Sequence, residues 1–204
     1  MTTERVYLFK RFERFWHWSQ AALVIALLIT GFRIHGVISG FDVETGIRVH
    51  MYAAWALMAL WAFAIFWHFT TGEWRQYIPT LDRAVAVARF YAWGIFLGEA
   101  HPYHPTPEHK QNALQRLAYL WVKILINPMI WISGLALLFM ALNWTTLESA
   151  RPFGVSLQTL AWAHTIAAYM MATFFVLHIY LATTGATPLA HIKAMITGWE
   201  LNEQ

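Results

Sequence analysis

Five histidines lie in or beside long apolar stretches of the chain, and they are the residues best suited to chemistry: His17, His50, His68, His164 and His178. An ionisable side chain inside a membrane-spanning segment is unfavourable, so each is a candidate for function. An imidazole can bind a metal, carry a proton or simply pack with a hydrogen bond. A lone membrane histidine most often does the last, so the spacing of the five is the informative feature.

The spacing places histidines in register along two predicted helices. His164 and His178 are 14 residues apart, which puts both rings on nearly the same helix face, about 21 Å apart along the axis. His50 and His68 are 18 residues apart. That is five full turns, so they also share a face, about 27 Å apart. Two helices therefore each carry one histidine near either end.

The gaps between charged residues predict the helices that carry these histidines. Four stretches contain no Asp, Glu, Lys or Arg, namely 15–32, 49–72, 124–147 and 152–192. A spanning helix needs about 20 apolar residues. No cluster of turn residues divides the last stretch, so we read it as one long helix. We expect an all-α membrane protein with a single domain over 1–204 and four spans at about 15–35, 48–70, 117–142 and 157–184.

Composition supports a membrane protein and excludes several other classes. Apolar residues make up 58%, charged residues 12%, and the mean hydropathy is +0.43. The chain has no cysteine, which excludes disulfides, thiolate zinc sites, cysteine-bound iron–sulfur clusters and covalent C-x-x-C-H haem attachment. The net charge of +3 does not indicate nucleic acid, because the basic residues flank apolar runs and act as topology signals.

The distribution of basic residues predicts an orientation and two levels of histidines. With the N-terminus inside, eleven of the fourteen Lys and Arg lie on the inner side, so both termini are predicted to be cytoplasmic. His50 and His164 then lie at an outer level. His17 and His178 lie at an inner level, and the predicted depth of His68 in the membrane is the same.

Depth-matched histidine pairs are typical of bound haem. A b-type haem needs two axial nitrogens, one on each face, so two stacked pairs predict two haem b groups in a four-helix bundle. Small residues beside the ligands would make room for the macrocycles: Ala161, Ala163, Ala167 and Ala168 near His164, and Ala53 and Ala54 after His50. The basic side chains expected to pair with haem propionates are Arg14 at the inner level and Arg48 or Arg151 at the outer level.

The loop between the second and third spans is predicted to lie at the inner surface. Residues 80–97 mix apolar residues with three charges and favour an amphipathic interfacial helix in this cytoplasmic loop. His101, His104 and His109 follow among three prolines. Their irregular spacing disfavours a metal site, so we expect a solvated loop or a contact with a partner.

Several motifs resemble the diheme cytochrome b subunits of bacterial nickel–iron hydrogenases, formate dehydrogenases and thiosulfate reductases. The first predicted span carries Phe15-Trp16-His17-Trp18 and Thr30-Gly31-Phe32, the second carries the single His50, and the last carries the histidine pair spaced 14 residues apart. The third span opens with Asn112-Ala113-Leu114-Gln115-Arg116-Leu117-Ala118-Tyr119. Phe66-Trp67-His68-Phe69 and Gly72-Glu73-Trp74 resemble the thiosulfate-reductase-like branch most. The resemblance covers nearly the whole chain.

The resemblance implies specific roles. The outer haem would be bound by His50 and His164 and the inner haem by His17 and His178. Quinone would react beside the inner haem near Asn112 and Gln115, whose amides can donate to a quinone and accept from a quinol. Both residues also suit a plain helix cap.

The aromatic, interfacial neighbours of His68 favour a structural, proton-relay or quinone-adjacent role rather than ligation. With Glu73, it is a candidate to carry protons from quinol oxidation.

The function expected from these features is electron transfer in the bacterial inner membrane, between the quinone pool and a periplasmic redox partner such as an iron–sulfur or multihaem subunit. Membrane lipid and quinone are the other expected partners, and nucleic acid is not. A stand-alone membrane cytochrome b that acts on a small acceptor directly is one alternative. A haem-free membrane anchor or proton-linked transporter is another.

Overall fold

The computed structural model describes residues 3–78, 80, 83–99, 101–103, 105–107, 109–142, 156–185 and 187–203. Four helical stretches in it are long and apolar enough to cross a membrane. They are α1 (Arg11–Ile34), α2 (Val43–Thr71), a third span made of α4 (Ala113–Trp121), η3 (Val122–Ile126) and α5 (Asn127–Leu142), and α7 (Leu157–Ala182). The prediction of an all-α, four-span membrane protein is confirmed.

The first three spans begin four or five residues before the predicted positions, because polar caps start each helix ahead of its apolar run. The Asp42 carboxylate accepts a hydrogen bond from the Thr45 backbone N–H at 2.7 Å and opens α2. Ser156 does the same for Thr159 at 3.0 Å and opens α7. A side-chain acceptor at the N-cap satisfies a backbone donor that has no partner within the helix.

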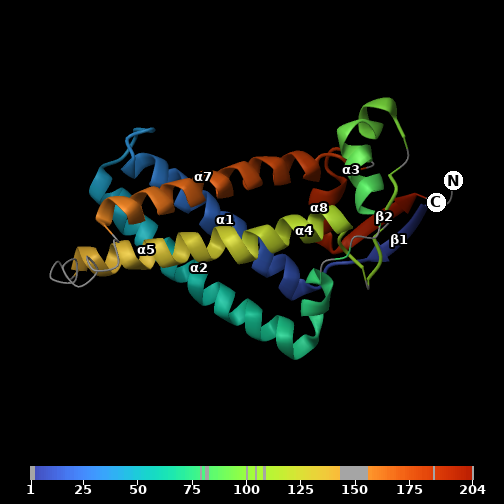
Figure 1. The fold of residues 1–204 in the computed structure, drawn as a ribbon. Coiled ribbons are helices and arrows are strands. Elements are labelled where there is room, and N and C mark those ends of the chain that lie inside the picture. The colour runs from blue at the N-terminus through green and yellow to red at the C-terminus, as the bar shows by residue number, and fades with distance from the viewer. Residues whose placement is uncertain are drawn as a thin grey trace.

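The spans pack as two antiparallel pairs, α1 with α2 and α5 with α7, and form one elongated bundle (Figure 1). Many large apolar side chains on them point outward. Phe66 is 62% exposed and Val176 is 65% exposed. A soluble monomer rarely exposes so much apolar surface, so these faces suit contact with lipid.

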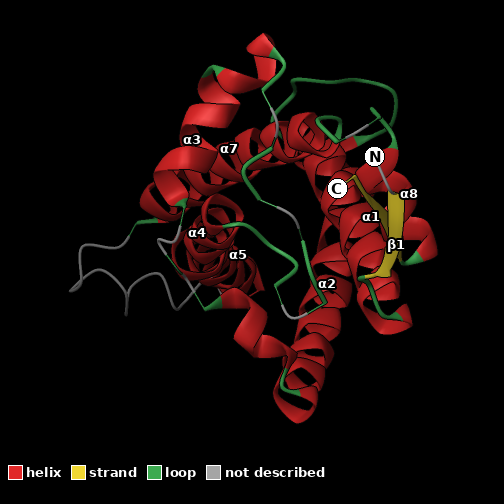
Figure 2. Cartoon of the chain, turned by 90° about the vertical axis from the view of Figure 1, so that its right-hand side faces the viewer, coloured by secondary structure: helices red, strands yellow, loops and turns green. Residues whose placement is uncertain are grey.

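Both chain ends lie at one end of the bundle, which we call the sheet end. There β1 (Thr3–Tyr7) pairs antiparallel with β2 (Trp199–Glu203), from Thr3 opposite Glu203 to Tyr7 opposite Trp199. The short helix α8 (Ala190–Thr197) leads into β2. Figure 2 views this end of the molecule. The sequence analysis gave neither strand, because each finds its partner at the opposite end of the chain.

The predicted interfacial helix is shorter in the structure than in the sequence analysis. The loop forms η1 (Glu73–Tyr77), then the nine-residue α3 (Ala84–Ala92), then the 3₁₀ turn η2 (Gly94–Leu97). Val87 and Phe90 are buried, whereas Val85, Trp93 and Phe96 are at least 70% exposed. The segment therefore buries some apolar side chains in the protein and exposes others, which suits contact with the membrane surface. The helix α3 lies across the sheet end at a steep angle to the spans (Figure 1).

The third span contains a π-helical segment, η3, between α4 and α5. A π-helix inserts an extra residue into the turn and is frequent at functional sites. Val122 and Ile126, its first and last residues, are both buried. The segment shifts the helix face presented to α7 partway along the span.

Candidate functional site

Two histidines from neighbouring helix pairs face each other at the end of the bundle opposite the sheet, which we call the far end. The ring centroids of His50 on α2 and His164 on α7 are 6.2 Å apart, with their planes at 70°. Both rings are partly buried between the helices. The structure therefore brings together the pair predicted for the outer level.

Buried hydroxyl groups fix the tautomers of this pair. Thr30 Oγ1 donates to the Ala26 carbonyl at 2.7 Å and lies 2.9 Å from Nδ1 of His50. Because its proton is already donated, the hydroxyl oxygen is free to accept from an Nδ1–H of His50. The other ring nitrogen, Nε2, is then unprotonated and able to bind a metal.

His164 is held in the same way from the third span. Its Nδ1 lies 3.1 Å from the Ile130 carbonyl, which can only accept, and 3.1 Å from Ser133 Oγ. The Ser133 hydroxyl in turn donates to the Met129 carbonyl at 2.5 Å. Nδ1 of His164 is therefore the protonated nitrogen, which leaves Nε2 with a free lone pair.

Two glycines allow these rings to sit against the helix backbones. A Cβ placed at Gly134 would lie 3.0 Å from Cε1 of His164, closer than ordinary contact, so no larger residue fits without displacing the ring. A Cβ at Gly31 would lie 3.7 Å from Cε1 of His50, which is ordinary contact. Gly134 thus restricts the position of His164 more tightly than Gly31 restricts that of His50.

A second pair faces across the bundle near the sheet end. The ring centroids of His17 on α1 and His178 on α7 are 6.1 Å apart, with their planes at 50°. Phe174 stacks on His178 at 5.8 Å and 18°. Within the described ranges, the buried Nδ1 of His17 has no hydrogen-bond partner.

His68 lies at the sheet end but is turned away from this pair. Its Nδ1 donates to the Ala64 carbonyl at 2.6 Å, and its Nε2 lies 3.4 Å from the Tyr77 hydroxyl. Its ring packs edge-on against Trp16, with centroids 5.2 Å apart. Both nitrogens are thus directed at protein groups, an arrangement that favours a structural or relay role.

The two facing pairs suit a metal held between imidazoles. A metal–imidazole nitrogen bond is about 2.0–2.1 Å, so two imidazoles on opposite sides of one metal have ring centroids roughly 6 Å apart. The observed 6.1 and 6.2 Å match this spacing. With the Nδ1 atoms of the far-end pair already bonded, the donor set fits bis-histidine haem.

The arginines predicted to hold propionates have other partners in the structure. Arg14 Nη1 donates to the Ile196 carbonyl at 2.5 Å, while its buried Nε has no partner among the described residues. Arg48 pairs with Glu44 at 2.9 Å on the exposed face of α2. Arg151 lies outside the described residues. The propionate assignments stay predictions.

Asn112 and Gln115 form the cap of α4. The backbone N–H of Gln115 donates to Asn112 Oδ1 at 2.9 Å, and that of Asn112 donates to Gln115 Oε1 at 3.0 Å. Asn112 is buried. This reciprocal capping box is the alternative that the sequence left open, and a quinone contact stays a prediction. Of the two, Gln115 keeps more freedom, because it is only partly buried.

A charge cluster missed by the sequence analysis ties the sheet end together. Lys110 Nζ bonds Glu13 at 2.7 Å and Glu73 at 3.1 Å, and Lys10 Nζ bonds Glu73 at 2.5 Å. Burial alone would raise the pKa of Glu73, but the hydrogen bonds from Lys10 and Lys110 outweigh it and lower that pKa. The bonded partners lie up to 97 positions apart, so no local sequence signal reveals the cluster.

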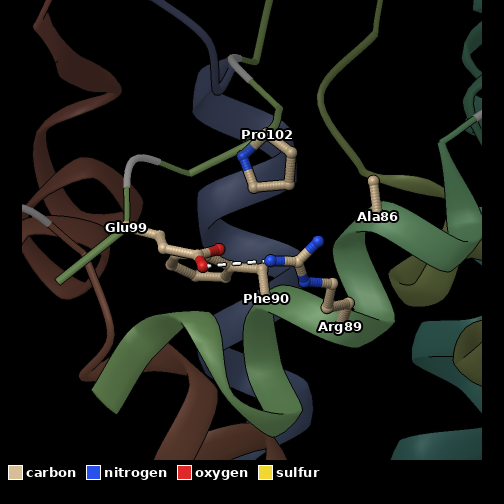
Figure 3. Close-up of a pocket in the computed structure, with 5 residues that line it drawn as sticks. All are labelled: Ala86, Arg89, Phe90, Glu99 and Pro102. Atoms are coloured by element: carbon tan, nitrogen blue, oxygen red, sulfur yellow. Dashed lines mark hydrogen bonds and ion pairs between the residues drawn. The ribbon is translucent and has the colours of Figure 1, made fainter. Parts of the chain in front are cut away.

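A small pocket of about 260 Å³ lies between α3 and the loop that follows it (Figure 3). Arg89 and Glu99, which line it together with Phe90, form a 3.2 Å ion pair. The paired charges neutralise each other, and no histidine lines the pocket. In the same loop, His101 bonds Tyr91 and His109 bonds Arg116, while His104 lies outside the described residues.

The fold and the two histidine pairs define a membrane cytochrome of the b type. Residues 8–198 match the model of the prokaryotic cytochrome b561 family, and the chain belongs to this family. It is similar to "Putative cytochrome YdhU" of Escherichia coli (strain K12), with 31% identity over 201 residues that cover 96% of this chain and 75% of the relative. No solved structure matches the chain.

This membership establishes a multi-pass membrane electron-transfer protein that binds haem b, and it confirms the predicted bacterial cytochrome b family. The thiosulfate-reductase-like branch stays a prediction.

Proposed function

We propose that the chain is a diheme subunit that transfers electrons between the quinone pool and a redox partner on the periplasmic side of the bacterial inner membrane. The observation that carries this proposal is the presence of two facing histidine pairs with nearly equal separations, at opposite ends of one bundle. Along α7 the two ligand positions are 14 residues apart, or about 21 Å. This separation would place one histidine pair towards each surface of a bilayer core of about 30 Å.

In this proposal His17 and His178 hold one haem b, and His50 and His164 hold the other. A haem iron carries one electron at a time, at a potential tuned by its ligands and surroundings. At the far-end pair, the chain fixes the two ligand rings through Thr30, Ser133 and the Ile130 carbonyl. Strongly anchored rings keep the ligand geometry constant when the charge at the site changes.

The sheet end supplies groups for protons released by quinol oxidation. Nε2 of His68 lies 3.4 Å from the Tyr77 hydroxyl. Tyr77 and Glu73 both belong to η1. Burial raises the pKa of Tyr77, so this phenol stays protonated and can donate. The carboxylates of Glu73 and Glu13, which Lys10 and Lys110 bond near the surface, would attract the released protons electrostatically rather than hold them.

Haem quantitation combined with quinol reduction tests the proposal. We expect about two haem b per chain by pyridine haemochrome, and reduction of both by a quinol. Alanine substitution at any of the four ligand positions should lower the count to one. A protein without haem after expression with adequate haem supply would contradict the proposal and favour a membrane anchor or transporter.

A second experiment identifies the partner side. Purification from the native membrane in mild detergent should yield a complex with a periplasmic redox subunit, and quinol should reduce that subunit through this chain. Isolation of the chain by itself, with direct turnover of a small acceptor, would instead favour a stand-alone cytochrome.

A further inference from the structure

At the far end, both ligand candidates have an oxygen that accepts the N–H of the ring. The Thr30 hydroxyl oxygen lies 2.9 Å from Nδ1 of His50 and is free to accept, because its own proton goes to the Ala26 carbonyl. The Ile130 carbonyl, which can only accept, lies 3.1 Å from Nδ1 of His164. Each ring of this pair therefore donates its Nδ1–H to a protein oxygen.

In the sheet-end pair, one ligand candidate lacks such an acceptor. Nδ1 of His17 is buried, yet it has no hydrogen-bond partner within the described part of the chain. The ring of His178 stacks on Phe174 at 5.8 Å and 18°, so an apolar ring covers one of its faces. The ring separations of the two pairs are almost equal, at 6.1 and 6.2 Å. The pairs thus differ in hydrogen bonding rather than in spacing.

A hydrogen bond from Nδ1 changes the energies of the two oxidation states of a bound iron unequally. Ferric iron carries one positive charge more than ferrous iron and withdraws more electron density from the imidazole. The Nδ1–H then carries more positive charge, and a more charged donor makes a stronger hydrogen bond. The bond therefore stabilises the oxidised form more than the reduced form and lowers the reduction potential. A buried N–H without an acceptor has the opposite effect, because nothing offsets its added charge.

The nearby charges do not oppose the difference in hydrogen bonding. Arg14 lies three residues before His17, and Arg33 lies three residues after Thr30, so both ends have an arginine within about one helical turn of the site. The ion cluster at the sheet end pairs two lysines with two glutamates, whose charges cancel. Lys123 lies over an aromatic ring of η1 at the sheet end. Its positive charge favours the reduced form there and so acts in the same direction.

We propose that the far-end haem has a lower reduction potential than the sheet-end haem, because the Nδ1–H groups of His50 and His164 are hydrogen-bonded and that of His17 is not. The inference rests on the proposed function, which supplies the two haems. It adds the order of their potentials and the groups that set it, the Thr30 hydroxyl and the Ile130 carbonyl. The first electron to enter the chain, from either side of the membrane, settles at the sheet end. Reduction at the far end is the second step.

An equilibrium redox titration of the haem-loaded protein tests the order of the potentials. The absorbance of reduced haem is followed against the potential, and we expect two one-electron components. His164→Ala leaves the sheet-end haem and His178→Ala leaves the far-end haem, so these single-haem variants assign the components. The lower potential should be found in His178→Ala. If it is found in His164→Ala, or if the two potentials coincide, the inference is overturned while the diheme function stands.

Substitutions at Thr30 test the cause of the difference. Thr30→Val removes the acceptor for His50 and keeps the shape of the side chain, whereas Thr30→Ser keeps the hydroxyl. With saturating haem, we expect Thr30→Val to favour the reduced form of the far-end haem about tenfold, a rise of about 59 mV for a one-electron step. Thr30→Ser and the sheet-end potential should not change. Thr70→Val is the control, because the Thr70 hydroxyl bonds only its own helix.

The outcomes separate this inference from the proposed function. No shift in Thr30→Val overturns the inference, and so does an equal shift in Thr30→Val and Thr30→Ser, which would trace the effect to packing rather than to the hydroxyl. Haem content is measured in every sample. A parent protein with fewer than two haems contradicts the diheme function and the inference together, whereas two haems with unshifted potentials contradict the inference alone.

Discussion

The hydroxyl of Thr30 lies 2.9 Å from Nδ1 of His50, which joins two consecutive spans at the ring of a haem-ligand candidate. The hydroxyl donates to its own helix and accepts from the ring, so Nε2 of His50 is left free for iron. Ser133 has the same relationship to His164 on the other side of the site. Two spans that supply no ligand to this pair, α1 and the third, thus decide which nitrogen of each ligand is available.

Substitution of Thr30 by valine should weaken haem binding at the far end. Valine keeps the shape of threonine but cannot accept the Nδ1–H bond, and loss of such a supporting bond typically weakens metal binding 10–100-fold, as an order of magnitude. Haem titration of the apoprotein measures the effect. Thr70→Val is the control, because the Thr70 hydroxyl bonds only its own helix at Phe66 and Trp67. Equal affinities in the two variants would contradict the role of Thr30.

Alanine at Gly134 should weaken haem binding at the far end, whereas alanine at Gly31 should leave it unchanged. The new Cβ at Gly134 would crowd Cε1 of His164 at 3.0 Å, and the one at Gly31 would stand 3.7 Å from His50. We expect a lower haem affinity in Gly134→Ala than in Gly31→Ala, measured by haem titration of the apoproteins. Equal affinities in the two variants would show that His164 can move without weakening the site.

Neutralisation of Glu73 should destabilise the protein at neutral pH. Glu73→Gln removes charged hydrogen bonds from Lys10 and from Lys110, which is only 5% exposed. We expect a loss of about 2 kcal/mol, seen as a Tm lower by about 4–8 °C in detergent. Glu44→Gln is the control, because the Glu44–Arg48 pair is exposed and such pairs contribute little.

The effect of Glu73→Gln should depend on pH with a defined sign. The folded-state pKa of Glu73 lies below its ordinary value of 4.5. The stabilisation is therefore present above about pH 4.5 and is lost as the pH falls through the lowered pKa. The Tm difference between the variant and the parent should shrink below pH 4.5, and a constant difference down to pH 3 would contradict this account.

Removal of His68 should slow quinol oxidation without loss of haem. The His68 ring is committed to Ala64 and Tyr77, so His68→Ala should keep both haems and reduce turnover. Tyr77→Phe should act in the same direction, because it removes the phenolic proton. Unchanged turnover in both variants would exclude a relay, and a lost haem in His68→Ala would place His68 among the ligands.

Reporter fusions should place both termini in the cytoplasm. The pairing of β1 with β2 requires the two ends of the chain to lie on the same side of the membrane, and the distribution of Lys and Arg favours the inner side. We expect activity from a fluorescent protein and none from alkaline phosphatase when each is fused to either end. A split result for the two ends would be incompatible with the strand pairing.

The sequence by itself determined the number of spans and their approximate positions, and it predicted a depth for each of the five membrane histidines. These properties follow from local features: the length of a charge-free run, the rise of a helix per residue and the placement of basic residues. The predicted starts of α1, α2 and α4 were four or five residues too late, because the caps of these helices at Lys10, Asp42 and Asn112 lie in polar sequence before the apolar run.

Only the tertiary structure decided which groups meet. His68 reaches the same depth as His178, yet it turns towards Tyr77 while His17 faces His178. The direction in which a side chain points across a bundle depends on how the helices rotate and pack against one another, and a single helix does not encode that rotation. The Glu13–Lys110–Glu73 cluster and the β1–β2 pair depend on contacts between distant segments for the same reason.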